Sequence, residues 1–231
     1  MKSKVCWLSL LIMAMATFWL VGCDREESGV VTAPMQNVQE EQEALVPSDQ
    51  VDKAYPPYSF SLNVPYLRQW PPGDRYDTKN CGQTCAVMLG NYYNNSPLNS
   101  SQITAQNSWL ATYTGDLRYN QANGWYTSTG QLRALLEQKH RLRTSYPACT
   151  TLEQLISIVA SGKPCIVGVR INDGNLVSSG GRAHWAIVVG WNGNVIVNDS
   201  GSSYGNHRSY SVAAFDASWA TSGRNYMAVW R

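Results

Sequence analysis

The sequence lacks the patterns by which metal sites and nucleic-acid-binding proteins are usually recognised. Its three histidines and six cysteines form no Cys-x-x-Cys and no His-x-x-x-His pair, the spacings typical of structural zinc sites. Its 18 lysines and arginines form no run interleaved with aromatic residues, which a nucleic-acid-binding surface would need. We therefore expect no bound metal ion and no nucleic-acid partner, and no motif indicates a cofactor.

A signal-like hydrophobic segment lies at the N-terminus. After a basic start, residues 5–20 are uncharged and continue into Val21-Gly22-Cys23. Small residues before a cysteine at the end of such a segment resemble the lipobox of bacterial lipoproteins. We expect residues 1–22 to be a lipoprotein signal peptide and Cys23 to carry the lipid that anchors the chain to a membrane of the bacterial cell envelope. A short membrane anchor or an ordinary secretory signal has a similar pattern.

The next segment, residues 24–57, differs in net charge from the remainder of the chain. Residues 24–57 hold eight acidic and two basic residues and show no apolar periodicity. Such a composition cannot repay the entropy of ordering, so we expect residues 23–57 to be a flexible acidic tether. Residues 58–231 hold 14 basic and 8 acidic residues, and this excess favours acidic peptides or envelope polymers as partners. Their length suits one domain with a full core.

The pattern from residue 58 onward predicts an α+β domain in which helices come first and an antiparallel sheet follows. The expected helices lie near residues 81–93, 101–110, 129–136 and 152–159. The expected strands lie at residues 60–66, 165–171, 185–191, 195–199 and 226–230. The first of these strands contains Pro65 and is therefore expected at a sheet margin. Thr150 and Glu153 have the spacing of a capping box for the last helix.

Cys81, His184 and Asp199 supply a thiol, an imidazole and a carboxylate in an order that suggests an enzyme. Cys81 opens an amphipathic helical stretch, and a helix N-terminus next to an imidazolium lowers a thiol pKa. His184 would take the thiol proton and later protonate the leaving amine, while Asp199 would fix its tautomer. The backbone N–H of Cys81 and the side-chain amide of Gln69 are candidate donors to an oxyanion.

The register of one predicted hairpin selects Asp199 over its neighbour Asn198. Asn192-Gly193 is a strong signal for a two-residue type I′ turn, in which both central residues have positive φ. Counting outward from that turn places Asn198 opposite Ile187, so Asp199 shares the face of His184. A three-residue loop would reverse this prediction, because a slip of one residue moves every side chain to the other face.

These residues stand within a larger set of matching segments. The set comprises Val64-Pro65-Tyr66-Leu67-Arg68-Gln69, Cys81-Gly82-Gln83-Thr84, Gly162-Lys163-Pro164, His184-Trp185 and Asn198-Asp199. Together they resemble the double-glycine leader peptidase-like family, which consists of papain-like cysteine peptidases known from bacteriocin-processing domains and stand-alone envelope proteins. The resemblance runs from about Ser59 to Arg231.

The resemblance implies a papain-like fold with N-terminal helices packed on a C-terminal antiparallel sheet. It also implies Gln69 in the oxyanion hole, Cys81 as nucleophile, His184 as base and Asp199 as orienter. The family usually has proline where this chain has Gln83, a change expected to alter the loop that leads into the helix.

The remaining cysteines and histidines give less information about structure and function. If Cys81 is a free nucleophile, Cys85, Cys149 and Cys165 can form at most one disulfide, for which Cys149 with Cys165 is a candidate. Burial of all three as small apolar side chains is the alternative. His140 and His207, the other two histidines, are expected to be exposed.

We expect a membrane-anchored cysteine peptidase that hydrolyses amide bonds of a peptide or protein substrate. Three alternatives remain open at this point: a peptide-binding module without catalysis, a transglutaminase-like acyl transferase, and a peptidoglycan amidase. Papain-like scaffolds host several chemistries, so the fold alone does not choose among them.

Overall fold

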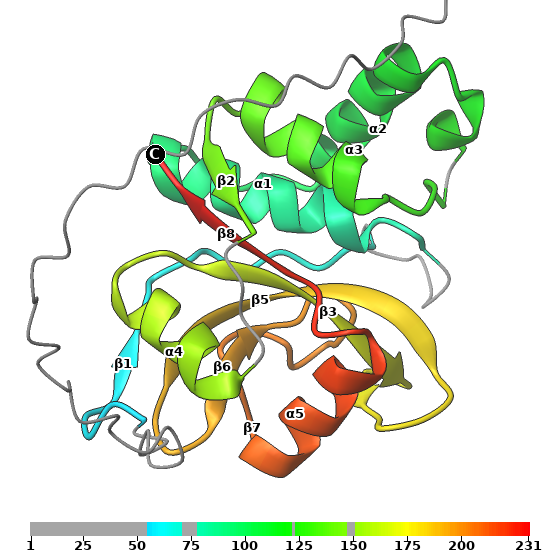
Figure 1. The fold of residues 1–231 in the computed structure, drawn as a ribbon. Helices are drawn as coiled ribbons and strands as arrows, with labels where there is room; N and C mark the ends of the chain where they lie inside the picture. The colour runs from blue at the N-terminus through cyan, green and yellow to red at the C-terminus, as the bar shows by residue number, and fades with distance from the viewer. Residues whose placement is uncertain (1–54, 71–77, 122, 147–150) are drawn as a thin grey trace, which may run out of the picture. The chain divides into compact units, whose positions relative to one another are not determined.

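The strands expected from residue 165 onward form the centre of an antiparallel sheet. The structure, a computed structural model, describes residues 55–70, 78–121, 123–146 and 151–231. Within these residues the sheet has eight strands in the order β2-β8-β3-β5-β6-β7, with β1 paired to β5 and β4 paired to β3 (Figure 1). The strands are β1 (Phe60–Ser61), β2 (Arg143–Ser145), β3 (Cys165–Asn172), β4 (Asn175–Leu176), β5 (Arg182–Trp191), β6 (Val195–Asn198), β7 (Arg208–Tyr210) and β8 (Tyr226–Trp230).

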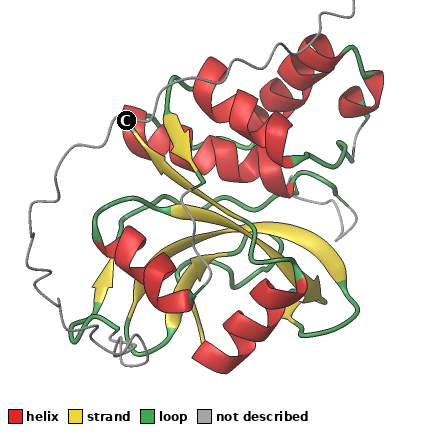
Figure 2. Ribbon diagram, viewed as in Figure 1, coloured by secondary structure: helices red, strands yellow, loops and turns green. Residues whose placement is uncertain are grey.

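Helices cover both faces of the sheet (Figure 2). They are α1 (Cys81–Asn94), α2 (Ser101–Thr114), α3 (Thr129–Ala134), α4 (Leu152–Ala160) and α5 (Val212–Thr221), with a 3-10 turn at Leu117–Asn120 and a π-helical turn at Leu135–Lys139 that extends α3. Helices α1 to α3 lie on one side, and α4 and α5 lie on the other (Figure 1). The predicted α+β class with N-terminal helices packed on the sheet is confirmed.

Alternation along the strands builds two separate cores. On β3, Ile166 packs with α1 to α3, whereas its neighbour Val167 packs with α4 and α5. On β5, Ile187 and Val188 divide between the two cores in the same way. Successive strand side chains point to opposite faces, so the runs of apolar residues in β3 and β5 fit strands that are buried on both sides.

Several predicted boundaries are wrong in detail. The expected strand at residues 60–66 forms β1 only at Phe60–Ser61, and the second helix continues to Thr114. The capping box uses Thr151 and Gln154, one residue after the predicted pair, while α4 begins at Leu152 as predicted. Strands β2, β4 and β7 and helix α5 were not expected from the sequence. They are short or weakly amphipathic, and periodicity does not detect such elements.

The hairpin between β5 and β6 has the predicted register but a different turn. Trp191 pairs with Val195, so the loop has three residues, of which Gly193 has a φ of +87° while Asn192 keeps a negative φ. A β-bulge between Val188 and Gly190 shifts the register back by one residue. Ile187 therefore lies opposite Asn198, as predicted. The extra loop residue and the bulge shift the register by one residue in opposite directions, so their effects cancel.

Parts of the sequence interpretation fall outside the described residues. These parts are the signal segment, most of the tether with Cys23, and Cys149. Cys81 and Cys85 are free buried thiols, and Cys165 is buried on β3. In the described part of the chain, no helix is both long enough and apolar enough to cross a membrane.

Candidate active site

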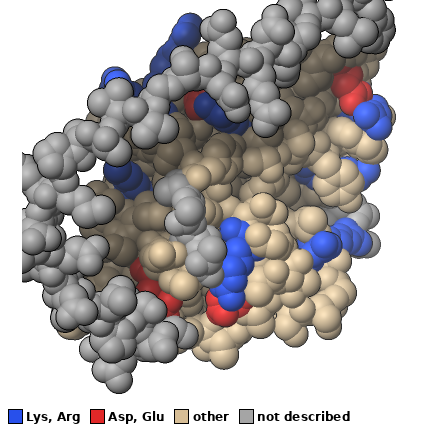
Figure 3. Space-filling view, viewed as in Figure 1, with Lys and Arg blue, Asp and Glu red and all other residues tan. Residues whose placement is uncertain are grey.

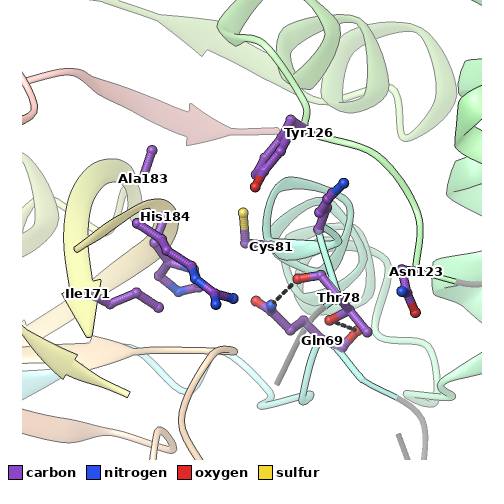
Figure 4. Close-up of a pocket in the computed structure, with 10 residues that line it drawn as sticks. Gln69, Thr78, Cys81, Asn123, Tyr126, Ile171, Ala183 and His184 are labelled. Atoms are coloured by element: carbon purple, nitrogen blue, oxygen red, sulfur yellow. Dashed lines mark hydrogen bonds between the residues drawn. The ribbon is translucent and has the colours of Figure 1, made fainter. Parts of the chain in front are cut away.

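Cys81 is the first residue of α1, as predicted, and lies at one end of the sheet. Asn80 precedes the helix, and its carbonyl accepts the backbone N–H of Thr84 at 2.9 Å. Figure 4 shows the sulfur of Cys81 directed into a cleft, with His184 on one side and Tyr126 on the other. The thiol therefore stands where the N–H groups of the first helical turn favour negative charge.

His184 and Asp199 meet across the β5–β6 hairpin. His184 Nε2 lies 2.9 Å from Asp199 Oδ1, and both side chains are almost fully buried. Asp199 Oδ1 also accepts the backbone N–H of Gly201 at 2.9 Å, and Oδ2 accepts the hydroxyl of Tyr210 at 3.0 Å. The carboxylate is thus held by three donors. Tyr210 lies on β7, a strand that the sequence pattern did not reveal, so its contact with Asp199 was missed.

Gly201 is required for this approach. A Cβ at Gly201 would lie 2.9 Å from His184 Cε1, closer than real Cβ atoms come to their neighbours, and 3.0 Å from Ile171 Cδ1, which is tighter than most real contacts. The residue after Asp199-Ser200 must therefore be glycine for the loop to pass beneath the imidazole.

The three ionisable groups shift one another's pKa. Burial disfavours the charged form of each, but the contacts among them outweigh it. The hydrogen bond and charge of His184, aided by backbone N–H groups of Trp185 and Gly82, hold the pKa of the Cys81 thiol below its ordinary value. Asp199 and Cys81 raise the pKa of His184 to about 10. His184 in turn lowers the pKa of Asp199. The arrangement favours a thiolate–imidazolium pair at neutral pH.

Gln69 lies in the same cleft as Cys81 and His184. Its backbone N–H donates to the carbonyl of Ser200 at 3.1 Å, which ties it to the loop after Asp199. One hydrogen of its amide group is used by the carbonyl of Thr78 at 2.8 Å (Figure 4). An amide nitrogen carries two hydrogens, so the second can reach an oxygen atom in the cleft.

Gln83 lies fully buried in the first turn of α1. Its Nε2 donates to Asn107 Oδ1 at 2.8 Å and to the carbonyl of Trp125 at 2.9 Å. Its Oε1 accepts the hydroxyl of Thr127 at 2.6 Å. Gln83 therefore joins the start of α1 to α2 and to the segment that forms the cleft wall beside Cys81.

Two clefts open on either side of the Cys81–His184 pair. One, of about 290 Å³, contains Gln69, Lys79 and Arg182. The other, of about 350 Å³, contains Trp185 and Arg170. On the face seen in Figure 3, basic side chains form separate patches among mostly uncharged residues. On this face the basic side chains are thus not gathered into one patch, and basic residues line both clefts, Lys79 and Arg182 in the first and Arg170 in the second.

His140 and His207 are half-buried, so their predicted exposure is wrong. His140 Nε2 lies 3.2 Å from Gln106 Oε1, and burial lowers the pKa of His140 to about 4. His207 Nε2 lies 3.1 Å from the carbonyl of Leu62. Both pack against polar atoms that the linear pattern does not reveal. Within the described residues, no group of His, Cys, Asp and Glu side chains could hold a metal ion.

The arrangement of helices on an antiparallel sheet is the fold of the papain-like cysteine peptidases. The model of the Peptidase_C39 like family matches residues 61–227, and the chain belongs to this family. A crystal structure of a candidate C39-like peptidase from Bacillus anthracis superposes with a TM-score of 0.52 at 15% identity, covering 75% of this chain and 98% of the other. Comparison with curated proteins gives no significant match.

Proposed function

We propose that the domain is a cysteine peptidase that hydrolyses peptide bonds through Cys81, His184 and Asp199. The observation that supports this most directly is the buried His184–Asp199 contact of 2.9 Å beside a thiol whose pKa is lowered. A buried imidazole with a raised pKa next to such a thiol has little structural purpose, whereas a thiolate nucleophile requires it. Membership of a peptidase family supports this reaction class.

The proposed reaction proceeds in two halves. The Cys81 thiolate attacks the carbonyl carbon of the scissile bond, and the backbone N–H of Cys81 and the Gln69 amide donate to the oxyanion that forms. His184 gives its proton to the leaving amine as the C–N bond breaks, which leaves a thioester. A water molecule deprotonated by His184 then attacks the thioester, and the acid product leaves as Cys81 returns to thiolate and His184 to imidazolium.

A thiol-reactive peptide electrophile tests the nucleophile. Wild type is expected to be labelled at Cys81, and Cys81→Ala is expected to lose both label and peptide hydrolysis. Cys85→Ala is the matched control, since Cys85 lies one turn further along α1 and burial raises its pKa well above the ordinary value. Equal labelling of wild type and Cys81→Ala would show that the assignment is wrong.

The same preparation separates the alternative reactions. Incorporation of an added amine into the acyl product would indicate acyl transfer, and release of muropeptides from purified peptidoglycan would indicate a cell-wall amidase. Binding of peptide that remains intact after long incubation would indicate a module without catalysis. Release of two peptide fragments is the result expected here.

We further propose that the domain acts in the bacterial cell envelope, tethered to the membrane by lipid on Cys23. The support is the sequence of residues 1–23 and the acidic segment that follows it. Metabolic labelling with a palmitate analogue is expected to mark wild type and to be lost in Cys23→Ser. Cys6→Ser, which lies within the expected signal peptide, should keep the label, and its loss there would contradict the proposal.

A further inference from the structure

We propose that the cleft on the Trp185 side of Cys81 is a subsite for a carboxylate of the peptide substrate, with Arg170 and Ser222 as its donors. This inference rests on the proposed function, because it takes Cys81 and His184 as the reacting groups between the two clefts. It adds the chemical class of substrate: a peptide that carries an acidic group close to the bond that is cleaved.

The first observation is the location of two unpaired donors. Among the described residues, two buried side-chain polar atoms have no hydrogen-bond partner, Arg170 Nε and Ser222 Oγ. Both residues line the cleft that also contains Cys81 and His184. Buried polar groups in native proteins are nearly always paired, so each exception requires an explanation. The side chains of Arg170 and Ser222 line the same cleft, so a ligand bound in it would lie beside two donor groups that lack a partner within the protein.

The structure holds these two donors in place through the backbone. The backbone N–H of Arg170 donates to Ser218 Oγ at 2.9 Å, and Ser218 Oγ donates back to the carbonyl of Arg170 at 2.9 Å. Ser222 ends α5, and its carbonyl accepts the side-chain amide of Asn225 at 2.6 Å. The backbones of both residues are thus fixed by α5 and its following turn, and both side chains line the same cleft.

The charge of the cleft selects a carboxylate. None of its lining residues is acidic, and among the described residues Arg170 forms no ion pair. A half-buried guanidinium without a carboxylate neighbour is only partly solvated and gains from an anionic ligand. A guanidinium fork and a serine hydroxyl both donate hydrogen bonds, as two carboxylate oxygens require.

Gly168 and Trp185 form an apolar part of the cleft wall beside Arg170. A Cβ at Gly168 would lie 3.5 Å from Trp185 Cζ3, 3.5 Å from Asn225 Cβ and 3.7 Å from Ser222 Cβ, which is ordinary contact. Position 168 is thus closely surrounded, and the ring of Trp185 offers an apolar wall for the methylene groups of an acidic side chain.

Binding to the unreactive Cys81→Ala variant tests the subsite without any chemistry. The ligands are peptides that wild type cleaves or, if none is found, a peptide library. Each peptide is made with glutamate, glutamine or lysine at each position in turn, and the binding affinities of these variants are compared. Glutamate is expected to bind roughly 10- to 100-fold more tightly than glutamine at one position, the range for a charge-assisted hydrogen bond. A peptide with a free terminal carboxylate, compared with its amide, distinguishes a chain end from an acidic side chain.

Substitutions of Arg170 and Ser222 test whether these two donors cause the preference for glutamate. Arg170→Met in the Cys81→Ala background is expected to remove the preference for glutamate, and Ser222→Ala to reduce it. Arg143→Met removes the same charge from an exposed position on β2 and should leave the preference intact. Arg170→Glu is expected to bind lysine better than glutamate, a gain that misfolding cannot produce. Thermal unfolding of each variant confirms that the domain is folded.

The outcomes separate the two proposals. Equal binding of glutamate and glutamine at every position by a folded Cys81→Ala protein overturns the carboxylate subsite and leaves peptide hydrolysis standing. Preference for glutamate that Arg170→Met retains also overturns it, because another group is then the donor. Preference for glutamate without hydrolysis by wild type supports the subsite and contradicts the peptidase.

Discussion

The two sides of the candidate active site are supported in different ways. On the helix side, Cys81 is backed by neutral groups, with Gln83 bonded to Asn107, Trp125 and Thr127. On the sheet side, His184 is backed by a buried carboxylate. Neutral amides fix positions with little effect on charge, whereas a carboxylate changes the protonation of its neighbour. The neutral groups behind the helix side therefore fix where the sulfur lies, whereas the largest lowering of the Cys81 pKa comes from His184 on the sheet side.

Removal of the Asp199 carboxylate tests the sheet side and should have the largest effect. Asp199→Ala leaves the Tyr210 hydroxyl and the Gly201 N–H without their acceptor and removes the charge that keeps His184 protonated. We expect kcat/KM to fall by roughly 100- to 1000-fold, or about 3–4 kcal/mol in the transition state. Asp199→Asn, which keeps an acceptor oxygen without the charge, should recover part of the loss. Unchanged kcat/KM in both variants would exclude Asp199 from the reaction.

The pH dependence of Cys81 alkylation tests the same side without mutation. Since the pKa of Cys81 is lowered and that of His184 is raised to about 10, the reactive pair exists between these two values. The alkylation rate by a small electrophile should rise about tenfold per pH unit below the thiol pKa and then stay constant through neutral pH. In Asp199→Asn the pKa of His184 should fall, which narrows this range from the alkaline side. A rate that rises only near pH 8.5, the ordinary thiol value, would contradict the ion pair.

Replacement of Gln83 tests the helix side. Gln83→Leu leaves the buried groups Asn107 Oδ1, Trp125 O and Thr127 Oγ1 without one partner each, which should lower the free energy of unfolding by about 1–3 kcal/mol. The pH profile of Cys81 alkylation should keep its shape, because no charge is removed. The matched control, Gln138→Leu at an exposed position, should change neither quantity. A shifted profile in Gln83→Leu would show that the two sides are not separate.

The Tyr210 hydroxyl should give the smallest effect. Tyr210→Phe removes one donor from Asp199 Oδ2 but leaves the contacts of Oδ1 with His184 and Gly201. A loss of about 1 kcal/mol in stability and a few-fold decrease in kcat/KM are expected. Tyr204→Phe is the control, since this tyrosine is 86% exposed. A decrease as large as that of Asp199→Ala would mean that Tyr210 itself acts in the reaction.

On the helix side, the sequence predicted the position of Cys81 but not the hydrogen bonds of Gln83 that support it. Cys81 could be placed at a helix start from the apolar spacing that follows it, and α1 begins there. The role of Gln83 could not be predicted, because its partners Asn107 and Thr127 are 24 and 44 residues away in the sequence. The sequence did hold one signal: Gln83 is a long polar side chain in the first turn of a helix that was predicted to pack against the sheet.

On the sheet side, the pairing counted outward from the Asn192-Gly193 turn correctly placed Asp199 on the face of His184, although the turn assumed in that count is not the one that forms. The expected two-residue turn does not form, but the bulge beside Gly190 restores the register. Strand β1 passes so close to this point that a Cβ at Gly190 would lie 2.4 Å from the carbonyl of Phe60. Pairing with a strand about 130 residues earlier in the chain shapes β5 there, and local turn rules do not include such contacts. Tyr210 was missed because its strand β7 is too short for periodicity to detect. Arg170 lies on a predicted strand, but the cleft that it lines includes Ser222 at the end of α5, a helix that was not expected.

The bulged hairpin also restricts how this protein can change in length. Deleting one residue from the loop between Trp191 and Val195 would exchange the faces of Asn198 and Asp199. Asn198 now donates to the carbonyl of Val64 and accepts the N–H of His207, contacts that an exchanged Asp199 could not fully replace. Homologous hairpins should therefore lose or gain loop and bulge residues together. In an alignment, an odd difference in loop length should be accompanied by a compensating one near Val189.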